Sequence, residues 1–271
     1  MACETDNVID ISGLHFAYGH SDILHDVSLH VGKGEMVGLL GPNGSGKSTI
    51  LKILSGILPD KYNNVNVTGQ ALHTLSRKSL AQRMATIPQE PVFSFPFTVL
   101  EVVLMGRQPH HAGLALETKE DIAIAEAALA RCGATDLAGR IIHELSSGER
   151  QRVVFARALA QQPEILLLDE PASFLDIRHQ VELYDIVRDL ACNQHCSILT
   201  VMHDINLAVE YCDRIYLLCN GKIAAGGTVD EVINTENISR VFNTPVMVDT
   251  NTVTGKPLVL PLSKQATAAG R

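Results

Sequence analysis

A glycine-rich segment near the N-terminus has the residue types and spacing to hold a phosphate chain. Residues 41–48 read Gly-Pro-Asn-Gly-Ser-Gly-Lys-Ser and match the pattern G-x-x-x-x-G-K-[ST] between an expected strand and an expected helix. Glycines let the backbone wrap around phosphates, and the N–H groups at the helix start attract the anion. The residues expected to contact a nucleoside triphosphate are Gly41, Pro42, Asn43, Gly44, Ser45, Gly46, Lys47, Ser48 and Thr49, which we call the phosphate loop.

Two carboxylates that follow an apolar run supply the complementary chemistry. The run Ile165–Leu168 is typical of a strand buried on both faces, and Asp169 and Glu170 follow it directly. We expect Lys47 to bind the β- and γ-phosphates, and Ser48 and Asp169 to hold Mg²⁺. Glu170 is a candidate general base for the attacking water. Together the two motifs predict a nucleoside triphosphate and Mg²⁺ as ligands, and hydrolysis of the γ-phosphate as the reaction; the family resemblance described next implies that the nucleotide is ATP.

A third motif points to a particular family. Residues 145–149 read Leu-Ser-Ser-Gly-Glu, and Arg-Gln-Arg-Val-Val-Phe-Ala-Arg follows. This resembles the L-S-G-G-Q signature of ATP-binding cassette (ABC) proteins, and nearly the whole chain resembles an ABC transporter ATPase subunit. The resemblance implies a head-to-tail homodimer with two ATP, in which residues of one copy contact the nucleotide of the other. Those residues are Ser146, Ser147, Gly148 and Glu149; Ser147 replaces a glycine and Glu149 a glutamine, which leaves the turnover rate open.

The resemblance also assigns roles to residues outside these motifs. Tyr18 resembles the aromatic residue that stacks on adenine, where the alternative is a core tyrosine. Gln89 resembles the glutamine that reaches Mg²⁺ and the attacking water, and His203 resembles the histidine that contacts the γ-phosphate. Residues 173–176, Ser-Phe-Leu-Asp, resemble the segment that crosses the dimer, with Phe174 in place of a small residue.

Alternation of strands and helices predicts an α/β fold with a parallel sheet. The expected strands are 8–11, 27–31, 36–40, 84–88, 165–168 and 197–202, and the expected helices are 47–58, 76–83, 98–106, 118–132, 148–161, 178–192 and 204–211. The resemblance implies a P-loop NTPase ABC ATPase core with an N-terminal antiparallel β subdomain and a helical subdomain inserted at about 98–161. We expect one domain over 1–264 and a disordered tail over 265–271.

Several connecting segments are also informative. Residues 60–75 are polar and indicate turns, and 90–97 carry two prolines and indicate a loop. Asn220-Gly221 predicts a hairpin, and residues 245–261 predict a short terminal sheet that could assist dimer contact. His110-His111 is read as an exposed loop rather than a metal site.

Composition excludes several classes of protein. The 271 residues carry 22 Lys and Arg against 30 Asp and Glu, a net charge of −8, which disfavours nucleic acid as a partner. A membrane-spanning helix needs about twenty apolar residues, and the aliphatic runs here are only a few residues long. The cysteine spacing lacks a paired C-x-x-C, so reduced thiols are expected rather than a metal cluster.

Residues 95–107, with Pro109-His110, resemble the ATPase subunits of importers for iron-siderophore complexes, haem and cobalamin. The resemblance implies two hydrophobic permease subunits, an indirect periplasmic or extracellular substrate-binding protein, and a place on the cytoplasmic face of the cell membrane. A short permease helix would seat beside the loop after Gln89. The alternatives are a non-transport ABC ATPase that acts on a soluble partner and a module that binds ATP without hydrolysing it. The role of residues 243–271 stays open.

Overall fold

The chain divides into two units, each with its own internal packing. The computed structural model describes residues 7–60, 64–89, 91–111, 117–173 and 175–263. One unit comprises residues 1–74 and 198–271, and the other comprises residues 75–197. Within the described residues, no helix combines the length and apolar character needed to cross a membrane.

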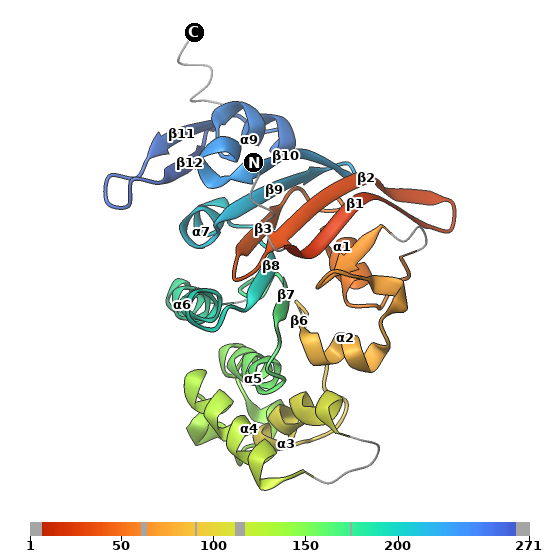
Figure 1. Ribbon diagram of the computed structural model, residues 1–271. Coiled ribbons are helices and arrows are strands. Elements are labelled where there is room, and N and C mark those ends of the chain that lie inside the picture. The colour runs from red at the N-terminus through yellow and green to blue at the C-terminus, as the bar shows by residue number, and fades with distance from the viewer. Residues whose placement is uncertain (1–6, 61–63, 90, 112–116, 174, 264–271) are drawn as a thin grey trace. The chain divides into compact units, whose positions relative to one another are not determined.

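Alternating apolar residues at the N-terminus of the first unit form an antiparallel sheet. Strand β1 (Asn7–Tyr18) pairs with β2 (Ser21–Gly32), and also with β4 (Val65–Val67), which pairs in turn with β5 (Gln70–Ala71). The order is β2-β1-β4-β5, and the long strands β1 and β2 lie side by side in Figure 1. The expectation of turns alone over 60–75 is therefore wrong, because β4 is too short to show alternation in the sequence.

A second group of strands in the first unit is mainly parallel. Strand β3 (Met36–Leu40) lies between β8 (Ser197–Val201) and β9 (Arg214–Cys219), and every residue of β3 and β8 is buried. Strand β10 (Lys222–Thr228) returns antiparallel to β9. The intervening Asn220 and Gly221 both have positive φ, 48° and 73°, as the predicted hairpin turn requires.

Helices and a terminal hairpin complete the first unit. They are α1 (Lys47–Leu54), η1 (Leu72–Thr74), α7 (Ile205–Tyr211), α8 (Val229–Val232), α9 (Thr235–Phe242), β11 (Val246–Thr250) and β12 (Pro257–Pro261). Helix α1 ends at Leu54 rather than near 58, because Gly56 turns left-handed with φ 71° and its N–H bonds to the Ile53 carbonyl. The predicted terminal sheet is confirmed as the β11–β12 hairpin.

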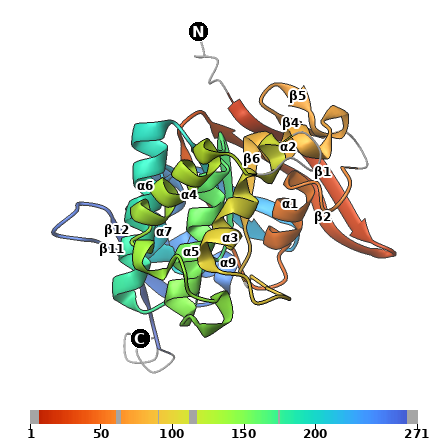
Figure 2. The ribbon, with the colours of Figure 1, turned by 90° about the horizontal axis from the view of Figure 1, so that it is seen from below.

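The second unit holds a parallel strand pair and a group of helices. Strands β6 (Met84–Ile87) and β7 (Ile165–Asp169) are parallel. The helical elements are α2 (Arg77–Arg83), α3 (Val99–Leu104), η2 (Met105–His110), α4 (Lys119–Arg131), η3 (Thr135–Leu137), η4 (Ile142–Glu144), α5 (Ser147–Ala160) and α6 (Ile177–Gln194). Helices α3, α4 and α5 pack against one another (Figure 2). Each begins with a capping box, in which a Ser or Thr and a carboxylate three residues later satisfy the first N–H groups.

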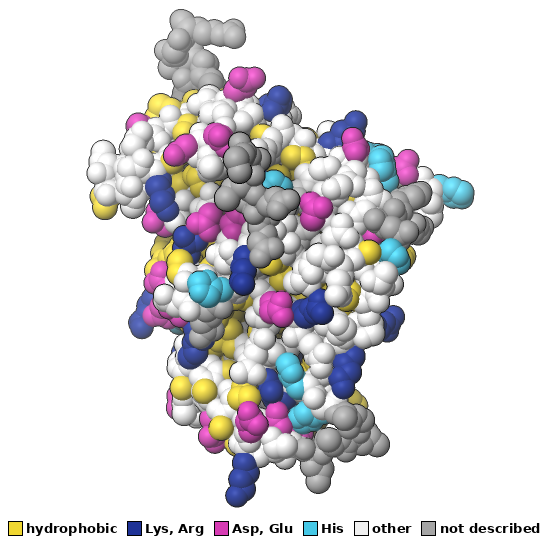
Figure 3. Space-filling view, in the orientation of Figure 1, with side chains coloured by type: hydrophobic (Ala, Val, Ile, Leu, Met, Phe, Trp, Pro, Cys, Tyr) yellow, Lys and Arg dark blue, Asp and Glu magenta, His cyan; other side chains and the backbone are white. Residues whose placement is uncertain are grey.

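Acidic and basic side chains are interspersed on the face drawn in Figure 3. That face has no broad region of positive charge among the described residues, in keeping with the net charge of −8. Nucleic-acid binding depends mainly on a clustered basic surface. The distribution on this face therefore gives no support to a nucleic-acid partner.

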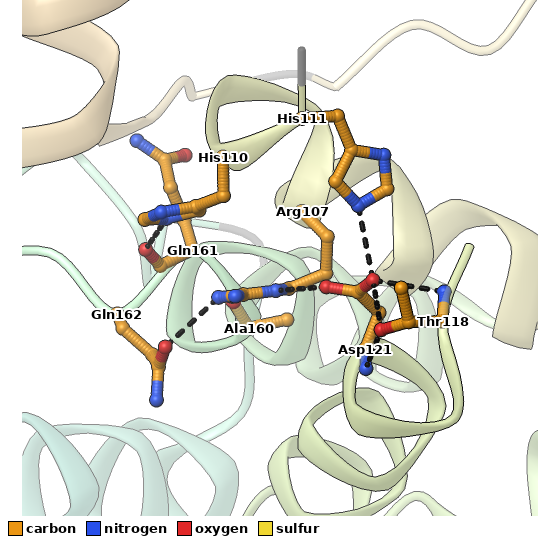
Figure 4. A network of polar contacts seen from close by, with 8 residues as sticks. All are labelled: Arg107, His110, His111, Thr118, Asp121, Ala160, Gln161 and Gln162. Carbon is orange, nitrogen blue, oxygen red and sulfur yellow. Dashed lines mark hydrogen bonds and ion pairs between the residues drawn. The ribbon is translucent and has the colours of Figure 1, made fainter. Parts of the chain in front are cut away.

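A buried ion pair ties the helices of the second unit together (Figure 4). Arg107 Nε lies 3.0 Å from Asp121 Oδ1, and both side chains are more than nine-tenths buried. The Arg107 Nη1 group donates to the Ala160 carbonyl at 2.7 Å and to Gln162 Oε1 at 2.9 Å. One guanidinium therefore joins η2 to the start of α4 and the end of α5.

His111 belongs to the same network, which corrects the reading of His110-His111 as an exposed loop. Its side chain is only 8% exposed, and its Nε2 lies 3.0 Å from Asp121 Oδ2 (Figure 4). The same carboxylate oxygen accepts hydrogen bonds from the Thr118 N–H and hydroxyl. His110 itself is exposed and contacts the Gln161 carbonyl. Among the described residues, no cluster of His, Cys, Asp and Glu could hold a metal ion.

The Arg107–Asp121 pair should dominate the acid sensitivity of the second unit. Hydrogen bonds from Thr118 and Arg107 hold the pKa of Asp121 far below its usual range. A lowered folded-state pKa means that the stabilisation is present above the unfolded pKa, about 3.9, and is lost as the pH falls through the folded value. Asp121→Asn should cost about 3–5 kcal/mol at neutral pH, because Arg107 is left buried without its counter-charge.

Urea unfolding at a series of pH values measures this directly. The difference in stability between the wild type and Asp121→Asn should shrink as the pH falls below about 4. Asp136→Asn, on an exposed carboxylate of η3, is the matched control and should change stability by less than about 0.5 kcal/mol. A pH-independent difference for Asp121→Asn would contradict the assignment.

Candidate active site

The phosphate loop joins β3 to α1, and two of its glycines combine positive φ with close neighbours. Gly41 has φ 153°, and a Cβ atom there would lie 2.0 Å from the Leu218 carbonyl oxygen. Gly46 has φ 110°, and a Cβ there would lie 2.6 Å from Leu24 Cδ2. The loop backbone thus runs directly against β9 and β2, and its conformation is available only without side chains at these positions.

The polar groups of the loop are arranged for an anion. Lys47 is buried, and its Nζ donates to the Gly41 and Pro42 carbonyls at 2.8 and 3.0 Å. Ser45 is 2% exposed, and its hydroxyl oxygen has no hydrogen-bond partner. Helix α1 has Gly46 as N-cap, so no side chain caps it, and its first turn carries no acidic residue. An unpaired buried hydroxyl and an uncapped helix start fit a phosphate chain.

Two further predicted residues lie in the same unit. Strands β3 and β8 are parallel, with Leu39 opposite Val201, so the phosphate loop and His203 both follow carboxyl ends on one edge of the sheet. His203 is exposed. Tyr18 ends β1 and is 45% exposed, which argues against the core-tyrosine reading. Its ring contacts Phe16 edge-on at 5.0 Å between centroids.

In the second unit, the structure brings Gln89 and Glu170 together. Gln89 follows β6 and Glu170 follows β7, and these strands are parallel neighbours. Gln89 Nε2 donates to Glu170 Oε2 at 2.6 Å. A groove of about 280 Å³ is lined by Gln89, Pro91, Val92, Ser147, Arg150, Gln151, Pro171 and Leu175. The glutamine and the start of the signature helix α5 therefore border one groove.

The signature segment is a capped helix start. Ser146 Oγ accepts from the Glu149 N–H at 3.3 Å, and Glu149 Oε2 accepts from the Ser146 N–H and hydroxyl at 2.8 and 2.7 Å. These bonds lower the pKa of Glu149, with smaller contributions from Arg140 and Arg152. Arg140 Nη1 lies 3.2 Å from Glu149 Oε1. The glutamate that replaces the signature glutamine thus keeps the capping geometry and adds a negative charge.

Some contacts were not foreseen from the sequence. Arg140 stands nine residues before Glu149, across an irregular segment, and no periodic pattern relates the two. Ser173 contacts Glu170 through both its N–H and its hydroxyl. Phe174 lies outside the described residues. The phosphate loop, Tyr18 and His203 belong to the first unit, whereas Gln89, Ser146, Asp169 and Glu170 belong to the second.

Gly41→Ala should destabilise the protein far more than Gly44→Ala. The new methyl at position 41 meets backbone oxygen at 2.0 Å, so β9 must move, at a cost of about 2–3 kcal/mol. Gly44 also has positive φ, 77°, but nothing lies within 4 Å of its Cβ position, so only the backbone strain of about 1 kcal/mol applies. Denaturant unfolding of both variants measures the difference, and equal losses would contradict the close approach to Leu218.

Comparison with known proteins agrees with this geometry. The family model described as ABC transporter matches residues 24–173, more than half of the chain. The chain is 40% identical over 261 residues to the cobalamin import ATP-binding protein BtuD of Halobacterium salinarum, covering 96% of this chain but only 65% of that protein. It is 43% identical over 255 residues to the hemin import ATP-binding protein HmuV of Thermobifida fusca, covering 94% of this chain and 89% of that protein.

A solved structure extends the likeness to three dimensions. A transporter assigned to the metal-chelate type of ABC transporters, in an inward-facing conformation, matches with a TM-score of 0.85 and 28% identity, over 96% of this chain and 99% of that one. The expected α/β fold of an ABC ATPase core is thereby confirmed. On the family model, the relatives and the fold together, the chain belongs to the ABC transporter family.

Proposed function

We propose that this chain is the ATP-hydrolysing subunit of an ABC importer. The observation that carries the proposal is the phosphate loop, with its uncapped helix α1 and the buried, unpartnered hydroxyl of Ser45. Such a loop supplies several N–H donors and one lysine charge to a triphosphate, and ATP is the ligand of that shape and charge. Two of the relatives are named as import ATP-binding proteins, which supports the assignment to an importer.

Two copies are needed for a complete site. The phosphate loop begins α1, which has no side-chain cap, and the signature begins α5, whose capped first turn still lies at the positive end of a helix dipole. In the proposed head-to-tail homodimer, the phosphate loop of one copy and Ser146, Ser147 and Gly148 of the other enclose the same ATP. Tyr18, exposed at the end of β1, stacks on the adenine.

The residues around the phosphates divide the chemistry between them. Lys47 neutralises the β- and γ-phosphate oxygens, and its present contacts with loop carbonyls give it an alternative partner when ATP leaves. Ser48, Asp169 and Gln89 supply the hydroxyl, carboxylate and amide oxygens that would hold Mg²⁺. When bound, Mg²⁺ neutralises charge on the β- and γ-phosphates.

Hydrolysis itself needs a positioned water. Glu170 is the proposed general base, and it accepts the proton of the water that attacks the γ-phosphorus in line. His203 donates to a γ-phosphate oxygen and so holds in place the phosphoryl group that is transferred to the water, while ADP is the leaving group. Because little covalent chemistry falls to the protein, orientation and electrostatics supply most of the rate.

The proposed partner is a pair of hydrophobic permease subunits at the cytoplasmic face of the cell membrane. Val92 lines the groove beside Gln89 and is 86% exposed, and Phe95, three residues later in the chain, is 63% exposed. A short permease helix in this groove would couple ATP-driven movement to transport. The cargo is an iron-siderophore complex, haem or cobalamin, delivered outside by a substrate-binding protein that this chain does not touch.

Glu170→Gln should abolish ATP turnover while leaving ATP binding intact. The amide keeps the shape of the side chain but cannot accept the proton, so kcat should fall at least about 100-fold. Phosphate release from ATP and equilibrium binding of ATP measure the two properties. Lys47→Ala is the comparison variant and should lose ATP binding as well. Full turnover by Glu170→Gln would remove the general-base assignment.

Glu149→Gln should lower the KM for ATP. Glutamine can form the same capping box, and the change removes a negative charge beside the proposed γ-phosphate position. The KM for ATP should fall about two- to threefold. Glu101→Gln, in the equivalent capping box of α3, is the matched control and should leave KM unchanged. An unchanged or higher KM for Glu149→Gln would place the signature away from the phosphates.

Co-purification with the adjacent permease and vesicle uptake separate transport from its alternative. ATP-dependent uptake of haem, a ferric siderophore or cobalamin that is lost in Glu170→Gln would establish both class and cargo. Intact ATPase activity without any membrane partner would instead favour an ABC ATPase that acts on a soluble partner.

A further inference from the structure

Ser173, the first residue of the segment 173–176, contacts Glu170 at two separate atoms. Its N–H lies 3.3 Å from the Glu170 carbonyl oxygen, and its hydroxyl lies 3.0 Å from the same oxygen. The hydroxyl also lies 3.2 Å from Glu170 Oε2. A single residue therefore contacts both the backbone and the carboxylate of the proposed general base.

The backbone of Glu170 needs such support. Its φ is 50°, in the left-handed region that a non-glycine residue enters at a cost of about 1–2 kcal/mol. Strained residues of this kind persist only where surrounding contacts fix them. Here the two donors of Ser173 close on the Glu170 carbonyl and form a tight turn directly after β7. The turn aims the glutamate side chain, because the left-handed residue sets the direction of its Cα–Cβ bond.

The Ser173 hydroxyl has one proton and two acceptors within reach. It can donate to the Glu170 carbonyl or to Oε2, and the exchange requires only rotation of the hydroxyl. Gln89 Nε2 donates to that same Oε2 at 2.6 Å. If Gln89 turns toward Mg²⁺, as the proposed function requires, Ser173 remains as a donor that keeps the carboxylate in place.

We infer that Ser173 is a positioning residue for Glu170, holding its strained backbone and its carboxylate in the orientation that hydrolysis needs. This inference rests on the proposed function, in which Glu170 accepts the proton of the attacking water. Ser173 itself transfers no proton and touches no reacting atom. Its loss should therefore lower kcat while the affinity for ATP, set by the phosphate loop, is retained.

Steady-state ATP hydrolysis by the purified full chain tests the role. Ser173→Ala should lower kcat about tenfold and change KM for ATP less than twofold. Ser173→Thr keeps the hydroxyl and should restore at least about half of the wild-type kcat. Thermal unfolding of each variant checks that the loss of rate is not a loss of fold. Because both side chains hold one oxygen, the effects of Ser173→Ala and Gln89→Ala on kcat should not be additive.

Ser55→Ala is the matched control. Its hydroxyl donates to the Lys52 carbonyl three residues earlier, the same local bond that Ser173 makes, but Lys52 is no acid. This variant should keep the wild-type kcat. Three results would overturn the positioning role, provided that the wild type is active. They are an unchanged kcat for Ser173→Ala, a raised KM for ATP in place of a lowered kcat, and no recovery of kcat in Ser173→Thr. A wild type no faster than Glu170→Gln would overturn the proposed function itself.

Discussion

The candidate site depends on one contrast between helix starts. Helices α3, α4 and α5 are each closed by a capping box, whereas α1 begins at Gly46 with no side chain on its first N–H groups. A helix start without a side-chain cap at the end of a glycine-rich loop is a suitable place for an anion. Gly41 and Gly46 let the loop backbone pass close to Leu218 and Leu24 and so reach the start of α1 in this conformation. In the proposed function, the other site residues act on the triphosphate that this loop holds.

In the second unit, contacts with neighbouring residues hold two acidic side chains, Glu170 and Asp121, in place. Glu170 has a left-handed backbone conformation directly after the strand β7, and Gln89 and Ser173 both donate hydrogen bonds to its carboxylate. In the same unit, Arg107 pairs with Asp121 of α4 and bonds to the Ala160 carbonyl at the end of α5, the helix that begins with the signature. Buried ion pairs seldom add stability over apolar packing, but they define one geometry. In the proposed function, such a fixed geometry lets these helices pass movement from bound ATP to the permease as one body.

Much of the fold and of the candidate site could be predicted, because these parts depend on the order and spacing of residues close together in the sequence. The phosphate loop specifies a strand, a turn and a helix in fixed order, and Asn220-Gly221 specifies a hairpin. Strand β4 was missed because three residues pair with β1 only through tertiary contact. The burial of His111 was missed because it depends on Asp121, ten residues later. Contacts set by three-dimensional proximity leave no periodic trace.

The central claim is that each ATP is enclosed by the phosphate loop of one copy and the signature of another. Mixing two inactive variants tests it most directly: Lys47→Ala impairs the phosphate loop, and Ser146→Arg blocks the signature. Random pairing makes half of the dimers mixed, and each mixed dimer has one intact site, so about a quarter of the wild-type ATPase activity should return. No recovery on mixing, from variants that fold and still dimerise, would contradict the shared site.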